Sequence, residues 1–205
     1  MSDGDPPNLV EAADGYALDP GDTLTVTFQV TVDDPLAPVI TEIVNTVSVT
    51  SDQTPTPVED TVTDPIASSI GDFVWDDLNG DGIQDGGEPG LDSVTVNIYR
   101  DVDGDGIAEP GGDDGAPVAT TSTVAGAFSF SDLLPDDYFL EFVILTGYLF
   151  SPQDQGADDT VDSDADPATG LTEVITLSAG ENDTTWDAGM YILTDISVTK
   201  TLTSA

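Results

Sequence analysis

The chain has 205 residues and a formal net charge of −39, from 41 acidic residues against two basic ones. A field this negative repels nucleic acid and anionic membrane surfaces and attracts cations, so nucleic acid is excluded as a partner. Cysteine and histidine are both absent, which excludes disulfides, thiol chemistry and the commonest general base.

Residues 1–66 contain three short segments in which apolar and polar residues alternate, the pattern of a half-buried strand. The clearest is 23–32, and 42–50 and 58–63 follow it. Three strands are too few to close a sandwich, so a partial N-terminal β module is predicted. We interpret residues 1–66 as the C-terminal half of an immunoglobulin-like surface-repeat module.

From Ile70 onward, turn residues separate seven further predicted strands. These are 70–75, 93–100, 117–124, 127–131, 137–145, 171–178 and 184–192. They predict an all-β fold, an immunoglobulin-like β-sandwich over residues 67–193. The tail, 194–205, is expected to be a linker and the first strand of a following module.

Three connections in this sandwich are long and acidic: 76–91, 101–116 and 151–170, named here the first, second and third acidic loops. Loops of this length in a compact domain need a source of order. Bound cations supply one, because they cross-link a loop that has no core of its own. The alternative is that the acidic side chains are a solvated surface.

The first acidic loop contains DLNGDGIQDGGE, Asp77 to Glu88, which has the ligand spacing of an EF-hand calcium loop. The predicted ligands are the side chains of Asp77, Asn79, Asp81, Asp85 and Glu88 and the carbonyl of Ile83. Gly82, at the sixth place, permits the sharp turn. Pro89 and Gly90 argue against a helix after the loop. A structural ion on a β scaffold is therefore predicted, rather than a sensor that opens a helix pair.

The second acidic loop repeats this spacing in DVDGDGIAE. The predicted ligands are the side chains of Asp101, Asp103, Asp105 and Glu109 and the carbonyl of Ile107. Its twelfth place is Gly112, so the closing carboxylate is expected from Asp113, Asp114 or elsewhere.

The third acidic loop has no EF-hand spacing. Its candidate ligands are Asp158, Asp162, Asp164 and Asp166. These side chains either complete a site begun by another loop or are solvated. The sequence thus predicts two or three Ca²⁺ ions. Trp75 and Trp186 are predicted to belong to the core rather than to a sugar-binding platform.

The segment IGDFVWDDLNGDGIQDGGEPGLDSVTVNIYRD, followed by GAFSFSDLLPDDYFLEF and DAGMY, resembles the B domains of serine-aspartate repeat surface proteins. The resemblance covers about 69–192 and implies a calcium-binding immunoglobulin-like module in the stalk of a bacterial surface adhesin. It places the family's calcium loop on Asp77, Asn79, Asp81, Asp85 and Glu88. Related modules lock themselves with an isopeptide bond from a lysine. The only lysine here is Lys200, outside the sandwich, so calcium is expected to supply the stiffness.

The expected function is a calcium-stabilised spacer or stalk module of a secreted, cell-surface adhesin, with neighbouring modules of the same chain as partners. The alternative is an adhesion module that itself binds a host or matrix protein or a glycan. A third possibility is an acidic, salt-adapted surface layer without specific ions. No enzymatic activity is expected, and no apolar run is long enough for direct membrane insertion.

Overall fold

The structure, a computed structural model, describes residues 40–50 and 55–193. These residues form eleven strands, and none of them is helical. No described segment is therefore a helix long and apolar enough to cross a membrane. The predicted strand 23–32 and the tail from residue 194 lie outside the described residues.

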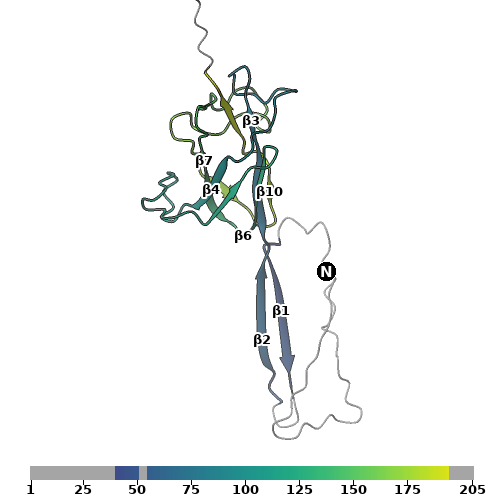
Figure 1. The fold of residues 1–205 in the computed structure, drawn as a ribbon. Coiled ribbons are helices and arrows are strands. Elements are labelled where there is room, and N and C mark those ends of the chain that lie inside the picture. Colours follow the sequence, from purple (N-terminus) through teal and green to yellow (C-terminus); the bar gives the residue numbers. More distant parts are fainter. Residues whose placement is uncertain (1–39, 51–54, 194–205) are drawn as a thin grey trace, which may run out of the picture. The chain divides into compact units, whose positions relative to one another are not determined.

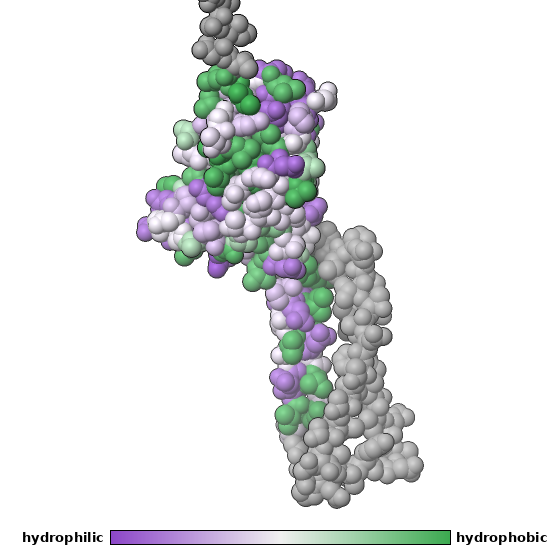
Figure 2. Space-filling view, in the orientation of Figure 1, coloured by the Kyte–Doolittle hydropathy of each residue, from purple (hydrophilic) through white to green (hydrophobic). Residues whose placement is uncertain are grey.

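Strands β1 (Glu42–Val49) and β2 (Val58–Pro65) form an antiparallel hairpin. Their register pairs Val49 with Val58 and Glu42 with Pro65. Because side chains alternate across a strand, Ile43, Val47, Val49, Val58 and Val62 share one face. Four of these, all except Ile43, are among the exposed apolar residues, and Figure 2 shows apolar surface between hydrophilic residues along this segment.

The first sheet of the sandwich is built around β3 (Ser68–Asp76) (Figure 1). On one side β3 pairs with the antiparallel strand β6 (Ala127–Leu133). On the other it pairs with two parallel strands in succession, β10 (Asn182–Asp183) and β11 (Ala188–Tyr191). The short strand β8 (Leu149–Phe150) extends the sheet beyond β11.

The second sheet is antiparallel, in the order β5-β4-β7-β9. Its strands are β4 (Thr95–Arg100), β5 (Ala119–Ser122), β7 (Asp136–Val143) and β9 (Ile175–Leu177). Alternate side chains of both sheets face inward and form one core. Ile70, Phe128 and Met190 come from the first sheet, and Ile98 and Phe142 from the second. Phe128 packs edge-on against Phe142, with ring centroids 5.5 Å apart.

The prediction of an all-β, immunoglobulin-like sandwich with long loops is confirmed. All seven predicted strand regions contain observed strands, and the 42–50 and 58–63 strands form the hairpin. Two strands, β8 and β10, were not predicted, because two residues carry no alternation. The predicted strand 171–178 is shorter as observed. Only 175–177 pairs continuously, and Leu171 makes an isolated bridge to Glu141. The domain boundaries at 66/67 and 193/194 stay predictions.

Candidate metal centre

The first acidic loop is wound around the carboxylate of Asp77, which directly follows β3 and is only 1% exposed. The N–H of Gly80 donates to its Oδ1 (2.6 Å), and the N–H of Gly82 donates to its Oδ2 (2.9 Å). Both glycines have positive φ, the backbone conformation that such a tight turn requires. The residue at the first ligand place therefore also determines the shape of the loop.

Glu88 closes this loop. The N–H of Leu78 donates to its Oε1 (2.8 Å), and the N–H of Asp85 donates to its Oε2 (3.0 Å). These donors stand at the second and ninth places of the loop. One carboxylate thus ties the start of the loop to its end, as expected of a closing ligand.

Asn79 lies between the remaining carboxylates of the first loop. Its Nδ2 donates to Asp81 (2.9 Å) and to Asp85 (3.2 Å), and its Oδ1 accepts the N–H of Asp81 (2.9 Å). The N–H of Ile83 donates to the other oxygen of Asp81 (3.0 Å). The structure thus brings Asp81 and Asp85 together around the amide group of Asn79, but no three carboxylates of this loop lie within 4.8 Å of one another, as those of the second loop do.

The first loop rests on the third acidic loop. The N–H of Gln84 donates to the carbonyl of Val161 (2.7 Å), and the N–H of Ser163 donates to the carbonyl of Gly82 (3.1 Å). A Cβ on Gly82 would lie 2.2 Å from the carbonyl oxygen of Pro152. Glycine is therefore required here by its positive φ and also by this close approach.

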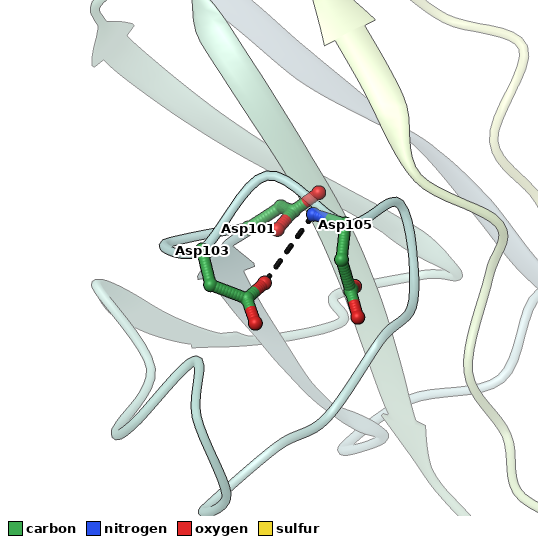
Figure 3. Close-up of side chains that lie close together, drawn as sticks. All are labelled: Asp101, Asp103 and Asp105. Carbon is green, nitrogen blue, oxygen red and sulfur yellow. Dashed lines mark hydrogen bonds between the residues drawn. The ribbon is translucent and has the colours of Figure 1, made fainter.

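The second acidic loop repeats the winding around its first residue, Asp101, which is 5% exposed. The N–H groups of Gly104 (2.8 Å) and Gly106 (3.0 Å) donate to its two oxygens. Asp103 and Asp105 follow it around the turn, and the N–H of Asp105 donates to Asp103 (3.3 Å) (Figure 3). One carboxylate oxygen from each of these three aspartates lies within 4.8 Å of the others. Ile107 donates its N–H to Asp105 (2.8 Å).

Asp114 closes the second loop. The N–H of Val102 donates to its Oδ1 (2.8 Å), and the N–H of Glu109 donates to its Oδ2 (2.9 Å). These donors again stand at the second and ninth places. The sequence left open whether Asp113 or Asp114 takes this role, and the structure assigns these bonds to Asp114, which is buried. Asp113 instead approaches Asp103 and Glu109, with oxygens within 4.8 Å of one another.

The crowding of carboxylates in the second loop affects their protonation. Desolvation and the neighbouring charge of Asp113 raise the pKa of Glu109. Desolvation, together with the charges of Asp105 and Asp114, likewise raises the pKa of Asp103. Both pKa values are raised, as expected where negative charges are held close together. A bound cation would lower them, because it favours the ionised carboxylates.

In the third acidic loop, Asp162 and Asp164 lie together, with Asp159 as the third member of a group whose oxygens are within 4.8 Å. The other two predicted residues shape local turns. The Asp158 carboxylate accepts the N–H and the hydroxyl of Thr160, and these bonds lower its pKa. The Asp166 carboxylate accepts the N–H groups of residues 168 and 169 and the hydroxyl of Thr169, and its pKa is lowered for the same reason.

Asp187, which directly precedes β11, was not among the predicted residues. It is fully buried against the third acidic loop, and its N–H donates to Asp164 (2.5 Å). Desolvation, followed by the charge of Asp72, raises its pKa to about 9. Desolvation also raises the pKa of Asp164 to about 8. In the sequence Asp187 is one aspartate among many, and only the packing of the loop identifies it.

These features define a class of protein: a β-sandwich module whose long loops gather carboxylates with calcium-loop spacing. The chain belongs to the SdrD B-like domain family, whose model matches residues 68–190.

Similar segments occur in staphylococcal proteins. The chain is 33% identical over 123 residues to serine-aspartate repeat-containing protein F of Staphylococcus epidermidis. It is 35% identical, over the same length, to serine-aspartate repeat-containing protein C of Staphylococcus aureus. Each match covers 60% of this chain but only 6% and 12% of these relatives, so the chain spans a small part of their length.

Among solved structures, GBS52, a minor pilin of Streptococcus agalactiae, is similar over 70% of this chain and 57% of its own. The identity is 13% and the TM-score 0.39. A similarity this distant carries no argument about function.

Proposed function

We propose that this chain is a calcium-stabilised spacer module of a modular bacterial surface protein, which holds neighbouring modules of the same chain apart. The observation that supports this proposal best is the common architecture of the first two acidic loops. In each, the first aspartate organises the turn, and a later carboxylate, Glu88 or Asp114, ties the second place to the ninth.

Calcium is the ion that the donor set favours. Every candidate ligand is an oxygen, and the chain has neither histidine nor cysteine for a softer metal. Ca²⁺ accepts six to eight oxygens in flexible geometry, whereas Mg²⁺ demands near-ideal octahedral coordination and keeps much of its water. Irregular loops with many carboxylates suit the larger ion.

A bound ion would stiffen regions that the core does not reach. When free calcium exceeds the dissociation constant about a hundredfold, one site adds about 2.7 kcal/mol to stability. Two such sites would approach the stability of a marginal domain, roughly 5 kcal/mol. The sandwich contains no lysine, so a lysine isopeptide bond is not available as another brace.

The proposed role is structural rather than catalytic, and it is supported by the way the acidic loops are held in place. The first and third loops contact each other through main-chain hydrogen bonds, and the first aspartates of the first two loops hold turns. A location at the bacterial surface rests on the family membership of residues 68–190. Host proteins or glycans would be the partners if the chain were instead an adhesion module, the alternative function.

Calorimetric titration with calcium tests the proposal. The wild-type chain is expected to bind at least two ions, and Asp81→Ala one fewer. This variant should lower the melting temperature more with calcium than in chelator, where it removes only the hydrogen bonds from Ile83 and Asn79. Asp60→Ala, which makes the same charge change in the exposed hairpin, is the matched control and should change neither quantity.

Small-angle scattering with calcium and with excess chelator, at matched ionic strength, tests the mechanical role. The radius of gyration should rise on chelation, because the first two loops lose their cross-links. Identical profiles, or no calcium binding by the wild type, would contradict the proposal. A host glycan or matrix protein captured by this chain alone would favour the adhesion module instead.

A further inference from the structure

Asn79 is the one asparagine of this chain that a glycine follows, since the other four precede leucine, threonine, isoleucine and aspartate. An asparagine amide is chemically labile when the next backbone nitrogen can reach its side-chain carbon. Glycine presents that nitrogen without a Cβ beside it, whereas a larger residue crowds the approach. The pair of Asn79 and Gly80 is therefore the position at which this reaction meets the least steric resistance.

The reaction is a deamidation that uses the main chain as its nucleophile. The nitrogen of Gly80 loses its proton to the solvent and bonds to Cγ of Asn79, and the bond from Cγ to Nδ2 breaks. Nδ2 takes up a proton and leaves as ammonia, so that a five-membered succinimide ring remains in the backbone. One water molecule then opens the ring at either of its two carbonyls. The products carry an aspartate or an isoaspartate at position 79.

The location of Asn79 leaves its amide open to this chemistry. It is exposed at the third place of the first acidic loop, whereas the other described asparagines lie in paired strands. Asn97 in β4 donates to Glu141 (2.8 Å) and accepts the hydroxyl of Thr120 (2.7 Å), and the residue after it, Ile98, is fully buried. Asn97 is therefore a natural internal control for Asn79.

The hydrogen bonds of the first loop oppose the reaction. The Asn79 amide donates to Asp81 (2.9 Å) and Asp85 (3.2 Å), and both bonds break when Nδ2 leaves as ammonia. The attacking nitrogen is held as well, because the N–H of Gly80 donates to the buried carboxylate of Asp77 (2.6 Å). An ionised acceptor stabilises this N–H, so the nitrogen keeps the proton that it has to lose. An ordered loop therefore protects the amide that it contains.

We propose that Asn79 is a deamidation site, that the ordered first acidic loop protects it, and that opening of this loop starts an irreversible modification. The site goes beyond the proposed function. The protection rests on the hydrogen bonds of the loop, and only its dependence on calcium rests on that function. Water is the co-reactant, and no enzyme is required. Because the product is not converted back, its amount records the total time that the loop has been open.

Either product weakens the hydrogen bonding of the loop. An aspartate at position 79 has lost the two donor groups of Nδ2 and adds a charge beside Asp81 and Asp85. An isoaspartate lengthens the main chain by one carbon atom, because the chain then runs through the side chain. This change shifts Gly80 and Gly82 away from the Asp77 carboxylate to which both donate. The modification therefore favours the open loop.

The second acidic loop has the same winding without the labile amide (Figure 3). Its third place is Asp103, which accepts the N–H of Asp105 (3.3 Å), and the N–H groups of Gly104 and Gly106 donate to Asp101. A carboxylate has no ammonia to release. The amides of this loop are therefore the matched reference for damage that is confined to the first loop.

Timed incubation of the full chain in mildly alkaline buffer tests the site, with calcium, with excess chelator, and in denaturing guanidinium chloride. Peptide mass spectrometry measures the replacement of each asparagine amide by a carboxyl group, and enzymatic methylation measures isoaspartate. In denaturant, Asn79 should convert faster than Asn97. In chelator, conversion of Asn79 should be at least about tenfold slower than in denaturant, the factor that corresponds to one charge-assisted hydrogen bond. Calcium should slow it further.

Equal rates at Asn79 in the folded and the denatured chain would overturn the proposal, because the loop would then give no protection. Conversion in denaturant that is no faster than at Asn97 would overturn it as well. If calcium and chelator give the same rate, and both are slower than denaturant, the deamidation site stands. That result counts instead against the proposed function, in which calcium orders this loop.

Hydrogen exchange of Asn79→Asp, the variant that matches one product, measures the damage. In chelator the amides of Gly80 and Gly82 should exchange about tenfold faster than in the wild type, again the factor for one such bond. The amides of Gly104 and Gly106 should be unchanged. Unaltered exchange at Gly80 and Gly82 would show that the modification leaves the loop closed, and the proposed effect on the loop would be wrong.

Discussion

Asp114 makes in the second acidic loop the same pair of backbone hydrogen bonds that Glu88 makes in the first. Each carboxylate accepts one N–H from the second place of its loop and one from the ninth. Glu88 stands at the twelfth place, however, and Asp114 at the fourteenth. A shorter side chain two residues later thus reaches an equivalent position, because a turn over residues 109–115 brings it back.

This equivalence predicts different effects for Asp114 and its neighbour Asp113. In excess chelator, Asp114→Ala should destabilise the protein by about 1–3 kcal/mol, because the N–H groups of Val102 and Glu109 lose a buried acceptor. Asp113→Ala should be neutral or stabilising in chelator, since it relieves repulsion with Glu109. Denaturant unfolding of both variants checks this. Equal losses for the two would show that Asp114 does not close the loop.

The sixth places of the first two loops provide a matched pair of glycines. Gly82 and Gly106 have nearly the same φ, 81° and 77°. A Cβ on Gly82 would meet the Pro152 carbonyl at 2.2 Å, whereas a Cβ on Gly106 has nothing within 4 Å. Gly106→Ala should therefore cost only the conformational strain, about 1–2 kcal/mol.

Gly82→Ala should cost clearly more, because the backbone of the third acidic loop must also move. It should weaken calcium binding at the first loop, whereas Gly106→Ala acts on the second. Melting temperatures with and without calcium, with calorimetry on each variant, distinguish the two effects. A smaller loss for Gly82→Ala than for Gly106→Ala would mean that the first and third loops are not in contact in solution.

A change in the core separates ordinary packing from ion binding. Ile98 is fully buried in the core between the two sheets, and it is none of the candidate ligands. Ile98→Val should lower the free energy of unfolding by about 1 kcal/mol through loss of one methylene. The loss should be the same with calcium and with chelator. A calcium-dependent loss would indicate that the core and the ion sites are coupled.

The sequence was sufficient where a feature is local. The alternation in β7, with Tyr138, Leu140 and Phe142 inward, predicts that strand directly, and the fixed spacing from Asp77 to Glu88 predicts the first loop. The sequence was insufficient where tertiary packing determines whether a strand forms. β8 forms because it pairs with β11, and β10 forms because it pairs with β3. A segment of two residues is too short for its sequence pattern to predict a strand.

Asp187 is the clearest case of this limit. The residue is one of 33 aspartates, so its identity carries little information. Its burial depends on a loop more than twenty residues earlier in the chain, which folds over β11 and supplies Asp164. Of the four aspartates predicted in that loop, two point into the cluster and two hold turns, a distinction that residue spacing does not contain.

The last prediction concerns pH in the absence of calcium. The pKa of Asp187 is raised to about 9 and that of Asp164 to about 8, both mainly through desolvation, from an ordinary value of 3.8. At pH values between 3.8 and the raised pKa values, the folded protein holds protons that the unfolded chain has already released. Stability must therefore fall as pH rises toward the folded pKa values.

In excess chelator, the melting temperature should decrease from pH 6 to pH 8, a window in which ordinary carboxylates are already ionised. Asp187→Asn should flatten this decrease, because asparagine has no proton to lose, whereas Asp132→Asn should leave it unchanged. Thermal melts at several pH values and constant ionic strength measure all three slopes. A melting temperature that rises with pH in chelator would show that Asp187 and Asp164 are ionised in the folded protein without an ion.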